Sequence, residues 1–139
     1  MKTAVRYHSL SGNTKKIAKI MAQELGVEAE SVGHPLAQPV DILFLGGAVY
    51  GGKLHGELLN FIENLPPDTA GKVAVFSTSG GNDDVACTLM KQALAARGFT
   101  AADEIFHCPG RFFFFINRGR PSQTDMQAAK AFARDIVTA

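Results

Sequence analysis

HSLSGNT, residues 8–14, is the stretch that decides the fold of this chain. An apolar run over residues 3–7 leads into it, and an amphipathic run starting at Lys15 follows it. The stretch therefore predicts a turn between a buried strand and a helix. Such a turn directs successive backbone N–H groups and the positive end of a helix at one point, which suits a phosphate group. Serine and threonine hydroxyls can donate to the remaining phosphate oxygens, and Gly12 lets the backbone curve around an anion.

Two commoner phosphate-binding loops do not match this turn, because it lacks both the three glycines of a dinucleotide loop and a Gly-Lys-Ser/Thr ending. GAVYGGK, residues 47–53, has the spacing of a triphosphate loop as far as its lysine, but Leu54 stands where the magnesium-binding hydroxyl belongs. The plainer alternative for residues 8–14 is an ordinary helix start with Ser11 or Asn13 as the N-cap. One cap needs one such residue, whereas this stretch combines three hydroxyls, one amide and one glycine.

Length, composition and net charge limit which kinds of protein this chain can be. The chain has 139 residues, of which 46% are hydrophobic and 19% charged, and its net charge is +1. These values predict one globular domain over residues 1–139 and give no strong field for nucleic acid or an anionic membrane. No apolar run approaches the ~20 residues of a membrane span. Cys87 and Cys108 have no CxxC spacing, so we expect reduced thiols and a cytoplasmic location.

Strand-like and helix-like patterns alternate along the chain. Strands are expected at residues 3–8, 27–32, 41–47, 72–77 and 102–108, and helices at residues 15–25, 54–65, 85–97 and 122–138. Ser122 is the expected N-cap of the last helix, with Asp125 in its first turn. This alternation predicts an α/β fold: a five-stranded parallel sheet in the order 2-1-3-4-5, with helices on both faces.

In such a sheet, ligands bind beyond the carboxyl ends of the strands, where the strand order reverses. We therefore expect the loops after the first, third and fourth strands to share one ligand. The second of these loops, residues 46–52, and the third, residues 78–82, hold six of the 14 glycines. Small residues are thus concentrated where a flat ring would need backbone contact.

YHSLSGNT, residues 7–14, followed by Ala18, resembles the FMN-phosphate loop of the flavodoxin family. The resemblance extends over nearly the whole chain and implies a flavodoxin-like three-layer fold with FMN as cofactor. It implies that the phosphate binds in the first loop and that the second and third loops flank the isoalloxazine. The implied cofactor-binding residues are Ser9, Leu10, Ser11, Gly12, Asn13, Thr14, Ala48, Val49, Tyr50, Gly51, Thr78, Ser79, Gly80 and Gly81.

The same resemblance implies a flavodoxin-type electron transfer protein, a flavoprotein without catalytic side chains or a metal. Its partners would be redox proteins or a small-molecule electron acceptor. The alternative is an FMN-dependent oxidoreductase of the quinone or protoporphyrinogen type on the same fold, because fold does not determine function. A non-redox module that binds phosphate or sulfate is a third hypothesis.

Two residues of the second loop have implied roles. Tyr50 would stack on a face of the flavin ring, although it could instead pack beside the helix that follows. Gly51 would turn its carbonyl toward flavin N5 when the ring is reduced, which would stabilise the neutral semiquinone. Glycine adopts both backbone conformations at low cost.

Two features depart from the family pattern. Arg6 stands inside the first strand, where an aliphatic residue is usual, and suggests a strand face that is not fully dry. The chain also lacks the strong acidity of flavodoxins, since only Asp83 and Asp84 flank the expected ring site. We therefore expect a less negative hydroquinone potential than in acidic relatives. The plainer interpretation of both aspartates is a solvated helix N-terminus.

Other residues are weighed against simpler interpretations. His8, His34, His55 and His107 show no metal-binding spacing, so each is expected at the surface or in a hydrogen bond, with His8 next to the phosphate loop. Cys108 is expected to be a buried thiol, because no arginine follows it at phosphatase spacing. Phe112–Phe115, followed by Ile116, could cover the sheet or form an exposed aromatic patch for a redox partner or a homodimer. Arg118 and Arg120 could border that patch and attract an acidic partner.

Overall fold

The computed structural model describes residues 1–81, 83–111 and 119–139. The predictions for Phe112–Phe115, Ile116 and Arg118 lie outside these residues. Along the described chain the elements are β1 (Thr3–Tyr7), α1 (Asn13–Leu25), β2 (Ala29–Ser31), β3 (Val40–Gly47), β4 (Val49–Tyr50), β5 (Lys53–Leu54), α2 (Gly56–Glu63), β6 (Ala70–Ser79), α3 (Val85–Ala96), β7 (Phe106–Pro109) and α4 (Gln123–Thr138).

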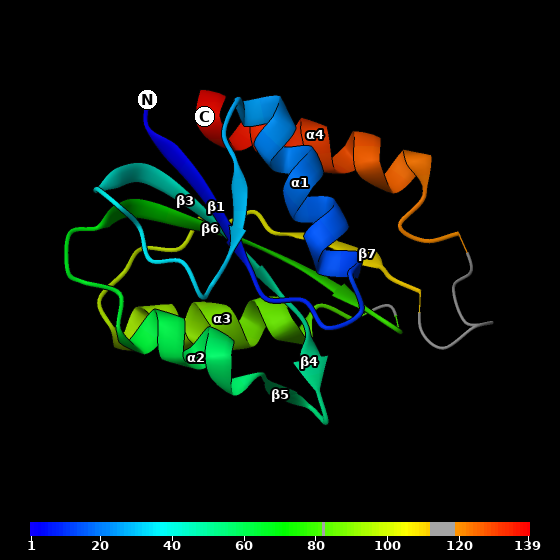
Figure 1. Ribbon diagram of the computed structural model, residues 1–139, viewed down its shortest axis with the longest axis horizontal. Helices are drawn as coiled ribbons and strands as arrows, with labels where there is room; N and C mark the ends of the chain where they lie inside the picture. The colour runs from blue at the N-terminus through cyan, green and yellow to red at the C-terminus, as the bar shows by residue number, and fades with distance from the viewer. Residues whose placement is uncertain (82, 112–118) are drawn as a thin grey trace.

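The predicted α/β architecture is confirmed. Strands β2, β1, β3, β6 and β7 form one parallel sheet in that order. Helices α1 and α4 cover one face of the sheet, and α2 and α3 cover the other (Figure 1). Of the helices in the described part of the chain, none is long and apolar enough to cross a bilayer.

Strand alternation divides the core into two layers. Val5, Phe44 and Phe76 lie in the layer beneath α1 and α4. Their neighbours along the strands, such as Leu45 and Val75, belong to the layer beneath α2 and α3. Residues 42–47 of β3 and 73–76 of β6 are continuously apolar, because side chains on both faces of these strands are buried.

Helix ends follow their local sequence. Gly26 ends α1 in a left-handed conformation, with φ of 73°, as expected. Ser122 caps α4 and forms a reciprocal capping box with Asp125. Arg120 donates two hydrogen bonds to the Asp125 carboxylate, and this contact lowers the pKa of Asp125. Arg120 is therefore already paired, which weakens its expected role in attracting an acidic partner.

Several predicted boundaries are wrong. The second helix begins at Gly56 rather than Leu54, because Leu54 pairs with Val49 in the small antiparallel hairpin β4–β5. The fifth strand begins at Phe106, since the exposed charged residues Asp103 and Glu104 interrupt it; only an isolated bridge at Ala101 precedes them. Val85, the first residue of α3, is 42% exposed, and Ala86 and Cys87 take the inward positions at the start of this helix.

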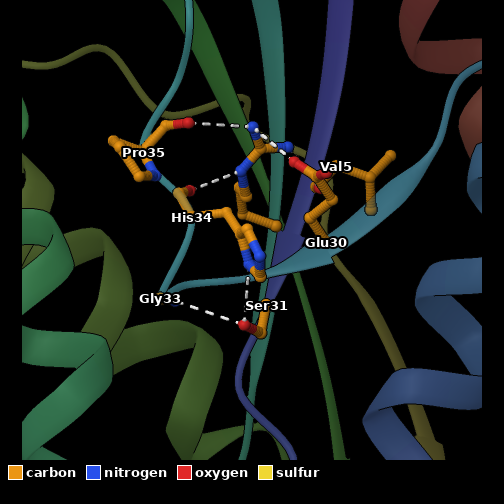
Figure 2. Close-up of polar contacts among 7 residues, drawn as sticks. Val5, Glu30, Ser31, Gly33, His34 and Pro35 are labelled. Carbon is orange, nitrogen blue, oxygen red and sulfur yellow. Dashed lines mark hydrogen bonds and ion pairs between the residues drawn. The ribbon is translucent and has the colours of Figure 1, made fainter.

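Arg6 is buried rather than partly exposed to water, and its guanidinium N–H groups have hydrogen-bond acceptors. Its Nε donates to the His34 carbonyl at 2.8 Å and its Nη2 donates to the Pro35 carbonyl at 3.2 Å. The same Nη2 lies 3.2 Å from the Glu30 carboxylate. Figure 2 shows how His34, Pro35 and Glu30 surround this charge. Burial lowers the pKa of Arg6, and Glu30 partly offsets that effect. Arg6 thus ties the β2–β3 connection to β1.

We predict that Arg6→Met lowers the free energy of unfolding by about 2–3 kcal/mol, because it removes charged hydrogen bonds to the carbonyls of Val5, His34 and Pro35. Arg134→Met is the matched control, since the Arg134–Glu24 pair lies at the surface and should contribute under about 1 kcal/mol. Urea denaturation measures both variants. Equal losses for the two would contradict the role assigned to Arg6.

Candidate functional site

The first loop, residues 8–12, joins the carboxyl end of β1 to α1. The N-cap of α1 is Gly12, in a left-handed conformation with φ of 91°, and not Ser11 or Asn13. Gly12 has no side chain to cover the helix start, and the first N–H groups of any helix lack partners within it. The Ser9 Oγ accepts the Gly12 N–H at 3.0 Å and keeps its own proton for donation. The start of α1 thus has no side-chain cap, and such a helix start suits an anion.

The first loop is held by contacts to the loops beside it. The Asn13 amide donates to the carbonyl of Arg111, after β7, at 2.8 Å. Thr14 and Thr78 are both buried and their hydroxyls lie 2.9 Å apart. The Thr14 hydroxyl is therefore engaged with Thr78 of the third loop.

The second loop is a hairpin that the sequence analysis missed. Strands β4 and β5 pair Tyr50 with Lys53 across a two-residue turn of Gly51 and Gly52. Both glycines have positive φ, of 61° and 77°, as a type I′ turn requires. Alternating residues around Gly-Gly were the available signal.

Tyr50 contacts the backbone of the first loop. Its hydroxyl accepts the Leu10 N–H at 3.3 Å, and its ring meets His8 and His55 edge to face. Tyr50 therefore connects the first and second loops, and it also packs beside the start of α2. The interpretation that Tyr50 packs beside the following helix agrees with this position, and stacking on a flavin ring stays a prediction.

Two of the loop glycines serve packing rather than a ligand. Gly46 and Gly47 are buried at the end of β3. A Cβ on Gly46 would lie 2.1 Å from the Phe76 ring, and one on Gly47 would lie 2.4 Å from Leu58. Both positions therefore require glycine for packing within the core, and neither was among the expected cofactor-binding residues.

The third loop follows β6 at the same edge of the sheet. Thr78 is buried, Ser79 is half-buried, and Gly80 and Gly81 are exposed. Asp83 and Asp84 are exposed at the start of α3, which agrees with a solvated helix N-terminus. The Asn82 position lies outside the described residues.

A cluster of His8, His55 and Glu57 was not foreseen, because His8 is far in sequence from the other two residues. His8 stacks on His55 at 4.1 Å, and its Nε2 lies 3.5 Å from the Glu57 carboxylate. Burial and His55 lower the pKa of His8, and Glu57 opposes them. Metal-bound imidazoles usually donate their second N–H to an acceptor. Here the His8 Nδ1 lacks a partner among the described residues, and the His55 Nδ1 accepts the Glu57 N–H as a helix cap. The contacts favour a capped helix start over a metal site.

Neither cysteine is placed for chemistry. Both are buried and free. Burial raises the pKa of Cys87 to about 11 and that of Cys108 to about 12, so each thiol stays protonated near neutral pH. The expectation of a buried Cys108 is confirmed.

A cavity of about 610 Å³ lies on the outer side of the first loop. It is lined by Ser11, Gly12, Asn13, Lys16, Arg111, Gly119, Arg120 and Pro121. Lys16 and Arg111 are exposed, so this side of the loop carries positive charge.

The comparisons with known proteins agree with this geometry. The model of the flavodoxin domain matches residues 4–113. The chain belongs to the flavodoxin family. This family member is 29% identical to an uncharacterized protein of Methanocaldococcus jannaschii, over 99% of each chain.

Two solved flavodoxins have the same fold. A flavodoxin from the domain Archaea superposes with a TM-score of 0.79 at 20% identity, over 98% of this chain and 96% of that one. Oxidised flavodoxin 2 from Bacillus cereus superposes with a TM-score of 0.76 at 25% identity, over 99% of each chain. The flavodoxin fold implies a flavin cofactor.

We predict that Thr14→Val and Thr78→Val each lower the free energy of unfolding by about 1–2 kcal/mol, because each leaves a buried hydroxyl without its partner. The double variant should lose clearly less than the sum of the two, since it removes both polar groups. Chemical denaturation of the wild type, the two single variants and the double variant gives the double-mutant cycle. Additive losses would show that the two hydroxyls do not interact.

Proposed function

We propose that this flavodoxin-family protein binds FMN and carries electrons. The observation that supports this most strongly is the convergence of three loops of small residues at the carboxyl edge of β1, β3 and β6. The contacts between Leu10 and Tyr50 and between Thr14 and Thr78 join the first loop to the other two. This edge is where an open doubly wound sheet binds its ligand.

The residues present fit FMN. Ser9, Leu10, Ser11, Gly12, Asn13 and Thr14 would hold the phosphate, mainly through backbone N–H groups and the serine hydroxyls. Ala48, Val49, Tyr50 and Gly51 would lie on one side of the ring, and Thr78, Ser79, Gly80 and Gly81 on the other. Bound FMN supplies the electron-transfer chemistry, while these residues bind it, exclude water and adjust its potentials.

Tyr50 links binding to a local rearrangement. An anion that accepts the Leu10 N–H must replace the Tyr50 hydroxyl, which accepts it in this structure. The released Tyr50 would then be available to cover the ring. The low density of carboxylates around the site supports a less negative potential for full reduction than in acidic flavodoxins.

An FMN-dependent oxidoreductase is the second candidate. The basic cavity beside the first loop favours it, because Lys16 and Arg111 would suit a substrate that carries an acidic group. The same cavity could instead receive an acidic redox partner. Turnover with NAD(P)H and a quinone would support the enzyme, and stoichiometric reduction without turnover would support the carrier.

We predict that the purified protein binds one FMN per chain, is yellow and shows a flavin absorbance spectrum. Denaturation should release the FMN. Riboflavin should bind more weakly, because the first loop would lack its anion. A reductive titration followed by absorbance measures both potentials. Failure of FMN to bind at micromolar concentrations would contradict the proposed function.

We predict that Gly51→Ala makes the first one-electron potential of bound FMN more negative, because alanine resists the backbone rotation proposed for this residue. Gly52→Ala is the matched control. It has the same positive φ in the same turn and should cost a similar ~1 kcal/mol of stability without changing the potentials. Equal potentials for the Gly51 variant and wild type would remove Gly51 from this role.

A further inference from the structure

His107 lies on β7 and contacts the end of β6, from which the third loop begins. Its Nδ1 is 2.8 Å from the Ser77 Oγ, and its Nε2 is 3.3 Å from the Ser79 Oγ. Ser77 is fully buried, and its Oγ accepts a hydrogen bond from the Cys87 thiol at 3.3 Å. Four side chains thus form one continuous chain of hydrogen bonds.

Counting protons shows which atom donates and which accepts in each of these hydrogen bonds. The Ser79 hydroxyl has one proton, and it donates to the Gly81 carbonyl at 2.9 Å and more weakly to the Asp83 carbonyl at 3.4 Å. Toward His107 it can only accept, so the His107 Nε2 must carry a proton. A neutral imidazole has one N–H, so its Nδ1 is an acceptor. The Ser77 hydroxyl donates to it while accepting from Cys87. Every donor in the chain then has an acceptor.

We propose that neutral His107, protonated on Nε2, is a positioning residue that holds Ser79 and, through it, the third loop. The role in flavin binding rests on the proposed function, because residues 78–81 would flank the ring. His107 contacts Ser77 and Ser79, and of these two only Ser79 is proposed to flank the ring. It would act on affinity by reducing the number of conformations that the loop adopts before binding.

The surroundings of His107 favour the neutral form. A second proton, on Nδ1, would deprive the Ser77 hydroxyl of its acceptor. This would happen at the fully buried end of the hydrogen-bonded row. Burial lowers the pKa of His107, and the carboxylates of Asp83 and Asp84 oppose this from the loop before α3. A lowered pKa means that the stabilisation is complete above the ordinary value of 6.5 and is lost as the pH falls below it.

The tautomer can be tested without any ligand. Long-range ¹H–¹⁵N spectra of the apoprotein at pH 7 should show a neutral His107 with its proton on Nε2. A proton on Nδ1, or a cationic ring, would overturn the inference.

Two substitutions separate the two ends of the imidazole. His107→Asn keeps an acceptor near Nδ1 for Ser77 but is too short to reach Ser79. His107→Gln offers an acceptor and a donor about as far apart as the two ring nitrogens. We expect His107→Asn to accelerate hydrogen exchange in residues 79–83 and to raise the FMN dissociation constant about tenfold, as losing one hydrogen bond would. His107→Gln should restore both values to within about twofold of wild type.

His34→Asn is the control, because His34 is an exposed histidine on another loop. Circular dichroism and urea denaturation confirm that each variant is folded. Wild-type exchange and affinity in His107→Asn would overturn the inference. Failure of the wild-type protein to bind FMN would instead overturn the proposed function, and the exchange data would still decide whether His107 holds the loop.

Discussion

The register of β1 against β3, and of β3 against β6, is the constraint on which the rest of the molecule depends. Tyr7 pairs with Gly46, and Gly46 pairs with Phe76, so these strands reach the same edge of the sheet nearly level. Shifting one strand by a single residue would move its side chains between the two buried layers. Because both layers are packed with apolar side chains, such a shift is costly. The loops that leave this edge therefore meet at one place.

Glycine contributes to this edge in three different ways. Gly46 and Gly47 allow the Phe76 and Leu58 side chains to approach the backbone of β3. Gly51 and Gly52 adopt the positive φ angles of a tight hairpin turn, and Gly12 leaves a helix start without a side-chain cap. Only the last of these leaves a helix start without a side-chain cap, as the proposed anion site requires. A count of glycines at the carboxyl edge therefore overstates how many of them face a ligand.

Buried polar groups fasten the loops to the rigid sheet. Arg6 binds the carbonyls of the β2–β3 connection, and the chain from Cys87 through Ser77 and His107 ends on the third loop. In each case a polar group inside the protein has partners, which is the condition for burying it at modest cost. Of these two sets of contacts, the one that ends on Ser79 involves a loop of the proposed site, where prior ordering would reduce the conformational entropy lost on binding. Stability and preorganisation of the site thus arise from the same hydrogen bonds.

The sequence by itself determined the alternation of strands and helices, the parallel sheet order, the turn from strand to helix over residues 8–14 and the capping of the last helix by Ser122 and Asp125. These features depend on periodicity and on neighbours a few residues away, which a linear pattern records. Only the tertiary structure decided that Arg6 is buried, that the Thr14 hydroxyl meets Thr78, and that His8 stacks on His55. Thr14 and Thr78 are 64 residues apart, and such partners are selected by strand register and helix packing. Local sequence specifies which elements form, whereas the shared core determines which of their side chains meet.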